Sequence, residues 1–256
     1  AGPLVRLACK RHLADLKGGK KRGLHWDRAA AARAINFFPD VLRLHEGEFA
    51  GAPFILQPWQ QFIVGSLFGW KGKDGARRFQ TGFIEAGKGS GKTPVVAGIG
   101  LYMLAADGEQ GAQCYAAAVA RAQADLMFAD AAQMARASPA LSSRLEILTS
   151  NIADFSTGSY FRPISSEGRS LDGKRVHFAG IDEIHEHRTD VVVRKVTAGI
   201  KGRRQPLVVE ITNSGVDRES VCFQHHHYSE QVLRGVIEDD QWFAYVCGLD
   251  EKDDWR

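Results

Sequence analysis

Short apolar runs alternate with longer segments whose apolar residues recur at helical spacing along most of this chain. The pattern predicts strands at 79–86, 112–118, 145–148, 153–156, 160–164, 176–182 and 206–212. It predicts helices at 58–69, 92–106, 119–137, 189–200 and 218–235. Alternation of this kind is typical of a mostly parallel sheet with helices packed on both of its faces. The chain is therefore predicted to have an α/β fold.

The start of the chain departs from this pattern, and we interpret residues 1–50 as a helical N-terminal appendage. Basic residues cluster there at Lys10, Arg11, Lys17, Lys20, Lys21 and Arg22. Helical spacing then runs through Trp26, Ile35 and Phe38. A short run of charges is typical of a solvated helix face, so we favour that interpretation over a DNA-binding site.

A glycine-rich turn lies between the predicted strand at 79–86 and the predicted helix at 92–106. Small residues in such a turn let consecutive backbone N–H groups converge on phosphate oxygens, while a lysine adds charge and a threonine hydroxyl ligates Mg²⁺. Ala86 stands where the strict pattern has glycine. The order of strand, turn and helix nevertheless predicts a phosphate-binding P-loop. Its predicted binding residues are Gly87, Lys88, Gly89, Ser90, Gly91, Lys92 and Thr93.

A second predicted strand ends in two carboxylates, because Asp182 and Glu183 follow the apolar run 176–181. We expect this strand to lie beside the P-loop strand, so that Asp182 meets a metal ion held by the P-loop hydroxyl. Glu183 can then polarise the attacking water as a general base. Together the two elements predict an ATP hydrolase with a P-loop NTPase fold of the RecA-like (ASCE) class.

Two further polar positions fit around such a site. Thr212 and Asn213 end the predicted strand at 206–212. Polar groups at the tip of a strand next to the nucleotide strand can sense the γ-phosphate and transmit its loss. Gln60, at the start of a predicted helix, offers an amide that can read an adenine edge.

Composition adds few constraints. The net charge is only +3 over 256 residues, so overall charge does not indicate nucleic-acid binding, and any DNA contact is expected to be a local patch. Cys9, Cys114, Cys222 and Cys247 lack pairing or metal-site spacing, as is typical of a reducing compartment. No apolar run reaches the roughly 18–20 residues that span a bilayer, so no membrane span is predicted.

Two other clusters suggest metal sites but do not have suitable spacing. His225, His226 and His227 fall in a predicted helix, where adjacent side chains point in different directions, so they form a poor zinc chelate even with His185 and His187. Acidic residues also cluster near the end of the chain, at Glu238, Asp239, Asp240, Asp250, Glu251, Asp253 and Asp254. Their setting around 242–246 favours a linker strand with solvated flanks. We predict no zinc site.

Several motifs occur together in an order and spacing that resemble one family. They are Leu-Gln-Pro-Trp-Gln at 56–60, the P-loop, the segment 110–123, Arg-Ser-Leu-Asp-Gly at 169–173, Ile-Asp-Glu-Ile-His at 181–185, Arg-Arg-Gln-Pro-Leu at 203–207 and Ile-Thr-Asn-Ser-Gly at 211–215. Over about residues 54–256 the chain is similar to the large terminase subunits of tailed bacteriophages, within the branch typified by HK97-like phages. The resemblance implies the ATPase domain of a DNA-packaging motor at residues 51–235.

The resemblance also implies a role for each matching side chain. Lys92 would hold the β- and γ-phosphates of ATP, Thr93 would bind Mg²⁺, and Asp182 would be the acid on the metal side. Glu183 would be the catalytic base, and Gln60 would contact adenine.

Coupling and transition-state stabilisation are expected to involve other positions. Thr212 and Asn213 would couple hydrolysis to movement. An arginine finger would be supplied by Arg169, with Arg204 as the second choice.

The family further implies partners and a cellular setting. Large terminases move double-stranded viral DNA through a portal protein into a procapsid, together with a small terminase subunit. They assemble as homo-oligomeric rings in the host cytoplasm and need no membrane. Full-length members continue into an RNase H-like nuclease, so residues 236–256 are expected to form a linker region leading towards such a domain, and no nuclease activity is expected within this chain.

Two other function classes remain open at this stage. Another P-loop DNA translocase or a helicase-like ATPase would share the P-loop, the acidic strand end and Gln60. A helicase also needs a second RecA-like domain, for which 256 residues leave no room. A P-loop binding module without turnover would have no need of a base at Glu183. We therefore favour the packaging ATPase.

Overall fold

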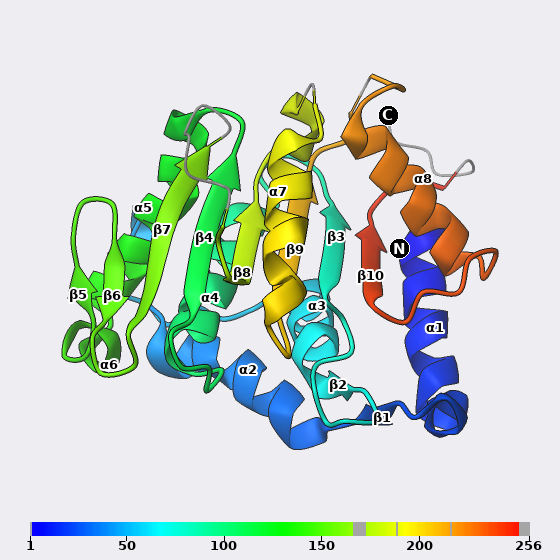
Figure 1. Cartoon of the computed structure of the whole chain (residues 1–256), viewed down its shortest axis with the longest axis horizontal. Coiled ribbons are helices and arrows are strands. Elements are labelled where there is room, and N and C mark those ends of the chain that lie inside the picture. Colours follow the sequence, from blue (N-terminus) through cyan, green and yellow to red (C-terminus); the bar gives the residue numbers. More distant parts are fainter. Residues whose placement is uncertain (1, 166–172, 188, 216, 251–256) are drawn as a thin grey trace.

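An eight-stranded sheet forms the centre of the computed structural model, which describes residues 2–165, 173–187, 189–215 and 217–250 (Figure 1). The strand order is β10-β3-β9-β8-β4-β7-β6-β5. The strands are β3 (Thr81–Glu85), β4 (Gln113–Ala118), β5 (Glu146–Ile147), β6 (Ile152–Asp154), β7 (Ser159–Ser165), β8 (Val176–Ile181), β9 (Leu207–Thr212) and β10 (Trp242–Val246). The pairs from β10 to β7 are parallel, and β6 and β5 are added antiparallel. This architecture confirms the predicted α/β fold.

Helices cover both faces of the sheet. They are α1 (Pro3–Gly18), α2 (Arg28–Val41), α3 (Pro58–Gly69), α4 (Lys92–Ala105), α5 (Arg121–Ala137), α6 (Pro139–Ser142), α7 (Val191–Gly199) and α8 (Val221–Leu233). Figure 1 shows α7 and α8 in front of the sheet and α4 behind it. Buried apolar side chains form one large cluster that joins α2 to α5 with the sheet and a second cluster beneath α7 and α8. No helix in the described part of the chain is long and apolar enough to cross a membrane.

The P-loop strand β3 does not lie beside the acidic strand β8, as we had expected. Strand β9 lies between them, with Glu85 of β3 opposite Thr212 and Ile181 of β8 opposite Glu210. That expectation was wrong because an apolar run shows that a strand is buried but not which strand is its neighbour. The consequence is that the polar tip of β9 lies between the P-loop and the two acids.

Residues 242–246, which we expected to form a linker strand with solvated flanks, instead form β10 at the edge of the main sheet. Trp242 lies opposite Thr81 and Val246 opposite Glu85, in parallel register with β3. Four of the five residues of β10 are buried. An apolar run of this length suits a strand that is covered on both faces, and α1 and α8 pack against it. Residues 251–256 lie outside the described part.

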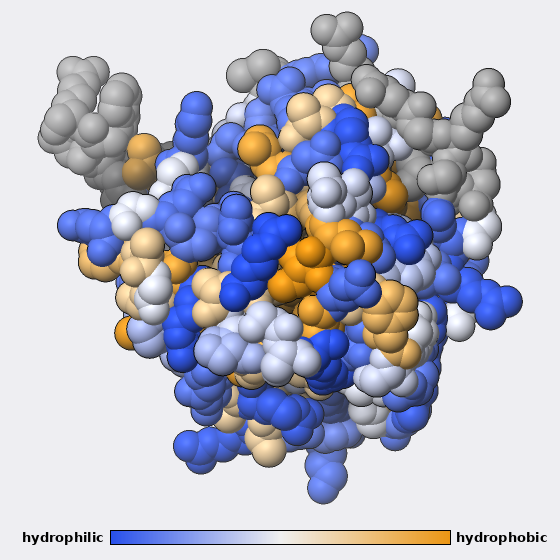
Figure 2. All heavy atoms as spheres, turned by 90° about the vertical axis from the view of Figure 1, so that its left-hand side faces the viewer, coloured by the Kyte–Doolittle hydropathy of each residue, from blue (hydrophilic) through white to orange (hydrophobic). Residues whose placement is uncertain are grey.

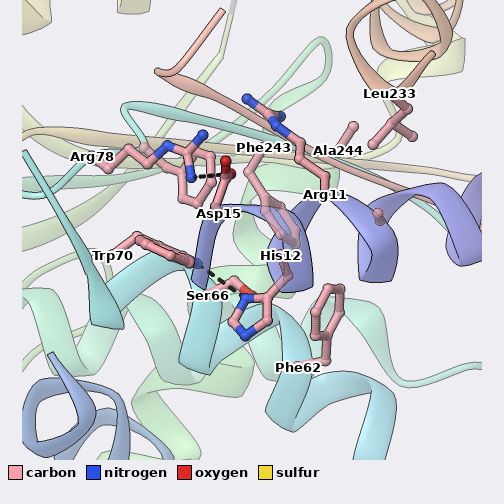
Figure 3. Close-up of a pocket in the computed structure, with 12 residues that line it drawn as sticks. Arg11, His12, Asp15, Phe62, Ser66, Trp70, Arg78, Leu233, Phe243 and Ala244 are labelled. Carbon is pink, nitrogen blue, oxygen red and sulfur yellow. Dashed lines mark hydrogen bonds and ion pairs between the residues drawn. The ribbon is translucent and has the colours of Figure 1, made fainter. Parts of the chain in front are cut away.

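Helix α1 is fixed to this edge of the sheet by buried charges (Figure 3). The Arg11 guanidinium donates to the carbonyl oxygens of Trp242, at 2.7 Å, and Asp239, at 2.5 Å. Burial, together with the neighbouring Arg78, lowers the pKa of Arg11 to about 10. Asp15 of α1 pairs with Arg78 at 2.8 Å. Arg11 thus differs from the exposed lysines of the basic cluster, which form the solvated face that we predicted.

A small cavity lies beside these charges, between α1, α3 and β10. It measures about 20 Å³ and is lined by His12, Ser66 and Trp70, among others (Figure 3). The Trp70 indole N–H donates to His12 Nδ1 at 3.0 Å. The buried Ser66 hydroxyl has no hydrogen-bond partner among the described residues. A cavity of this size accommodates one water molecule, so it suits a structural water rather than a ligand.

The opposite edge of the sheet carries an apolar surface. Figure 2 shows this face, where apolar side chains gather among polar ones. A groove of about 410 Å³ lies there between α5 and the end of β5, lined by Phe128, Ala132 and Leu148 and flanked by Arg121 and Arg136. Because β5 and β3 are separated by most of the sheet, this groove is remote from the P-loop.

Close packing of α4 on the sheet predicts that Gly100 cannot be enlarged. A Cβ atom there would lie 2.7 Å from the ring of Phe161 and 3.0 Å from that of Phe178, and both rings are fully buried. Alanine favours a helix over glycine by about 1 kcal/mol, but overpacking a core costs about 1–3 kcal/mol. We expect Gly100→Ala to lower the midpoint of thermal unfolding. Gly202→Ala, which meets no atom within 4 Å, should leave it unchanged; a stabilised Gly100→Ala protein would contradict this packing.

Candidate functional site

The turn between β3 and α4 has the backbone conformation of a phosphate-binding loop. Gly89 and Gly91 have φ angles of 77° and 79°, in the left-handed region that glycine enters without steric penalty. Ala86 has no such angle, so its side chain causes no strain. Its backbone N–H donates to the Thr212 carbonyl oxygen at 3.1 Å. Alanine is therefore accommodated where the strict pattern has glycine.

The first two residues of α4 contact the polar ends of two other strands. Lys92 is buried, and its ammonium group donates to Asn213 Oδ1 at 2.6 Å. The Thr93 hydroxyl donates to Asp182 Oδ2 at 3.0 Å. The structure thus brings together four predicted site residues that are up to 121 positions apart in the chain.

The remaining P-loop residues are open to a ligand. Gly87, Lys88 and Gly89 are exposed. The Ser90 hydroxyl is buried and has no hydrogen-bond partner among the described residues. A buried hydroxyl without a partner is unfavourable by about 1–3 kcal/mol. Because this hydroxyl lies at the N-terminus of α4, where the helix dipole favours anions, a bound phosphate would satisfy it.

Asp182 and Thr93 form an oxygen pair suited to Mg²⁺. Asp182 is buried, and this burial raises the pKa of its carboxyl group, while the Thr93 hydroxyl and the Glu183 backbone N–H oppose the rise. Adjacent ligands in an octahedral Mg²⁺ shell lie roughly 2.9 Å apart, close to the 3.0 Å between Thr93 Oγ1 and Asp182 Oδ2. The described residues hold no group of three or more potential metal ligands.

Glu183 occupies a strained turn directly after β8. Its φ and ψ of 47° and 51° make it the one non-glycine residue with positive φ in the described part of the chain. Such backbone costs about 1–3 kcal/mol and is concentrated at functional sites. The backbone N–H of Glu183 donates to Asp182 Oδ1 at 2.8 Å. Its carbonyl oxygen accepts from the Glu186 N–H at 2.8 Å, in the short 3₁₀ helix η3 (Ile184–Glu186).

Asn213 links the P-loop lysine to the acidic strand end. Its Oδ1 accepts from Lys92, and its Nδ2 donates to Glu183 Oε2 at 3.2 Å. Only this orientation of the amide fits, because the ammonium group can only donate and the carboxylate can only accept. Asn213 therefore contacts both the group predicted to hold phosphate and the predicted base.

Gln60 lies beside the P-loop at the start of α3. It is buried, and its Oε1 accepts from the Gln57 backbone N–H at 2.8 Å. Its Nε2 would lie 3.6 Å from a Cβ atom at Gly91. Trp59 stacks on Tyr245 of β10, with ring centroids 5.7 Å apart. The start of α3 and the end of β10 thus lie beside the P-loop and its strand β3.

Of the two arginine-finger candidates, Arg204 alone lies in the described part of the chain. Arg169 lies outside the described residues. Arg204 lies just before the amino end of β9, whereas the P-loop follows the carboxyl end of the parallel strand β3. There Arg204 donates to the Asp74 carbonyl oxygen at 2.5 Å. It therefore cannot reach a phosphate bound in its own subunit.

Two buried glutamates behind the site escaped the sequence analysis. Glu85 ends β3, and its carboxylate is paired with His226 at 2.7 Å and accepts from the Ser214 hydroxyl at 2.9 Å. Glu210 of β9 is paired with His225 at 2.6 Å. Each of these histidines thus has its own carboxylate rather than a share in a zinc site. A charged residue inside each apolar strand was the available signal, since buried carboxylates need partners.

The comparisons with known proteins agree with this geometry. A family described as "Terminase large subunit, ATPase domain" matches residues 58–231. Protein YmfN of Escherichia coli (strain K12) is 37% identical over 87 residues, which cover 34% of this chain and 19% of YmfN. The large terminase subunit of Enterobacteria phage HK97 is 23% identical over 190 residues, which cover 72% of this chain and 37% of the phage protein.

A solved structure shares the fold. The crystal structure of the HK97 bacteriophage large terminase matches with a TM-score of 0.73 and 20% identity, over 88% of this chain and 45% of that one. In all three pairwise comparisons the match spans less than half the length of the relative. The family match contains Gln60, the P-loop and the polar ends of β8 and β9.

The pair of His226 and Glu85 predicts a stability that depends on pH. The hydrogen bond with Glu85 raises the pKa of His226. The contribution of this pair to the free energy of unfolding is therefore complete below the unfolded-state pKa of about 6.5. It is lost as the pH rises through the pKa of His226 in the folded state. We expect His226→Gln to lower the unfolding midpoint more at about pH 6 than at about pH 9.

The neighbouring His227→Gln provides a matched control, because His227 is exposed on the same helix. Calorimetry of both variants and the wild type at the two pH values measures the difference. An equal loss of stability at both pH values in His226→Gln would contradict the assignment.

Proposed function

The chain belongs to the family of ATPase domains of terminase large subunits, and from this premise we propose that it hydrolyses ATP to drive the packaging of double-stranded viral DNA. The observation that carries the proposal is the meeting of the start of α4 with the polar ends of β8 and β9. Phosphoryl transfer requires phosphate binding, cation binding and a positioned water, and this arrangement offers a group for each.

ATP binding would use the P-loop amides and Lys92. An ammonium group binds a phosphate more strongly than a neutral amide, because the hydrogen bond is then between two charged groups. Lys92 would therefore exchange Asn213 for the β- and γ-phosphates when ATP arrives. Gln60, next to Gly91, would contact the adenine edge. Mg²⁺, held by Thr93 and Asp182, would neutralise charge on the phosphates.

Hydrolysis would use Glu183 as the general base. The carboxylate accepts a proton from the water whose oxygen attacks the γ-phosphorus, and the bond from that phosphorus to the bridging oxygen breaks. ADP and inorganic phosphate are the products. Glu183 is partly exposed, so water can reach it, and its neighbour Asn213 is placed to respond to the γ-phosphate through Lys92.

Coupling to movement would run through β9. Thr212 and Asn213 end this strand, and the backbone of Thr212 is bonded to Ala86 at the base of the P-loop. When the γ-phosphate leaves, Asn213 regains Lys92. The tip of β9 would thus adopt two states, one with Asn213 bonded to Lys92 and one with this bond broken. Two such discrete states are the requirement for a switch.

The packaging function implies partners that we propose by family membership. They are double-stranded DNA, a portal protein, a small terminase subunit and further copies of the chain in a ring, acting on a procapsid in the host cytoplasm. Family membership does not favour the alternative of a helicase-like translocase.

We do not assign DNA cleavage to the described residues. The acids before β10 have structural partners, since Asp239 accepts from the Tyr228 hydroxyl at 2.8 Å and Asp240 pairs with Arg78 at 2.6 Å. A nuclease needs carboxylates that are available to metal ions.

Binding and turnover should separate between two substitutions. Glu183→Gln keeps the shape of the base but cannot accept the proton, so ATP affinity should persist while turnover falls by roughly 10²–10⁴-fold. Lys92→Ala should lose both, because the charge opposite the phosphates is gone. Calorimetric titration with ATP and a phosphate-release assay measure the two quantities. Wild-type turnover in a folded Lys92→Ala protein would refute the proposed site.

An arginine supplied by a neighbouring subunit should be detectable by mixing variants. Arg169→Ala subunits keep an intact P-loop, while Lys92→Ala subunits keep an intact arginine. If the finger acts between subunits, mixtures should exceed the summed activity of the separate variants, because some interfaces pair an intact site with an intact arginine. The same mixture with Arg204→Ala tests the second candidate. Mixtures that never exceed the sum would indicate a finger that acts within its own subunit.

A further inference from the structure

We propose that His185 is a positioning residue that holds the base Glu183 against the tip of β9 and leaves one carboxylate oxygen to receive the proton. The inference rests on the proposed ATPase function and adds a residue to that site. Its basis is a set of contacts made by one imidazole nitrogen of His185, in η3.

The side chain of His185 lies between the base and β9. Its Nδ1 is 3.1 Å from Glu183 Oε2 and 3.0 Å from Thr212 Oγ1. The backbone N–H of His185 also donates to Thr212 Oγ1 at 3.2 Å. Thr212 is fully buried in the centre of the sheet, so it provides a fixed anchor.

The hydrogen-bonding capacity of the neighbours determines the role of Nδ1. The Thr212 hydroxyl donates its one proton to the Asn213 carbonyl oxygen at 2.7 Å, so it can only accept from His185. The ionised carboxylate of Glu183 can also only accept. Nδ1 therefore carries a proton, which it donates to Thr212 Oγ1, while Glu183 Oε2 lies 3.1 Å from the same nitrogen.

This arrangement makes the two oxygens of Glu183 different. Oε2 accepts a hydrogen bond from Asn213 Nδ2 at 3.2 Å and lies 3.1 Å from the protonated Nδ1 of His185. Oε1 has no hydrogen-bond partner among the described residues. The hydrogen bond from Asn213 and the close contact with the imidazole hold this oxygen in place, so the other oxygen is the one left for water.

The positions of Asn213 and His185 are expected to respond differently when a nucleotide binds. Asn213 is bonded to Lys92, so its position is expected to change when a phosphate takes that lysine. His185 is bonded to Thr212 and has no contact with the P-loop lysine in the described structure. His185 would therefore keep Glu183 in place while Asn213 changes partner. The other imidazole nitrogen, Nε2, faces the exposed Glu186 at 3.3 Å.

The test compares substitutions that remove or restore the Nδ1 donor. His185→Ala should lower kcat roughly 10- to 100-fold, the size expected for a misplaced catalytic group, while the KM for ATP changes less than about twofold. His185→Asn should recover most of kcat, because its amide nitrogen can take the position of Nδ1. His227→Ala, exposed on α8 and remote from Glu183, should behave as wild type.

A double-mutant cycle separates this role from a general loss of structure. Thr212→Val removes the anchor but keeps the shape of the side chain. The double variant should therefore lose much less kcat than the product of the fold-losses in Thr212→Val and His185→Ala. Independent effects, full activity of His185→Ala, or no recovery in His185→Asn would overturn the positioning role. A wild-type protein that binds ATP but does not hydrolyse it would instead refute the proposed function on which this inference rests.

Discussion

Strand β9 is hydrogen-bonded on one side to the strand that ends in the P-loop and on the other to the strand that ends in two acids. Because adjacent strands lie about 4.8 Å apart, β3 and β8 are separated by roughly 10 Å. The tip of β9 lies between the ends of these two strands. Asn213, just beyond this tip, is the group that connects Lys92 with Glu183. A ligand that binds both Lys92 and the attacking water would therefore lie next to this asparagine.

The same three strands carry charges that the core could not hold without partners. Glu85 and Glu210 are buried on adjacent strands, where an unpaired carboxylate would be strongly unfavourable. Helix α8 supplies His226 and His225 to these two groups. Since Glu85 also accepts from Ser214, next to Asn213, the docking of α8 is linked to the loop that follows β9. The polar network therefore extends from the helix layer to the ligand-binding edge of the sheet.

The sequence was sufficient to predict those parts of the site whose residues are neighbours in the chain. The P-loop and the acidic pair each combine a strand, a turn and a functional group within a few residues, and both predicted strands end within one residue of the observed carboxyl ends of β3 and β8. Strand order was not predictable, since the apolar runs of β3, β8 and β9 are alike and their pairing is nonlocal. The pairing of Glu85 with His226 spans 141 positions, and no local pattern indicates it. Residues 242–246 were predicted as a linker strand, and their pairing with β3 was missed for the same reason, because it is nonlocal.

The backbone of Glu183 adopts a strained turn that several hydrogen bonds hold in place. In the left-handed conformation the chain reverses directly after β8, and this reversal brings His185 back beside the residue two positions earlier. Glycine would adopt this conformation more easily but would bring no carboxylate. The cost of about 1–3 kcal/mol is offset by hydrogen bonds at both backbone groups of Glu183 and at Oε2. A turn that is fixed at so many points leaves the carboxylate little rotational freedom, so the direction of its remaining oxygen is a property of the fold.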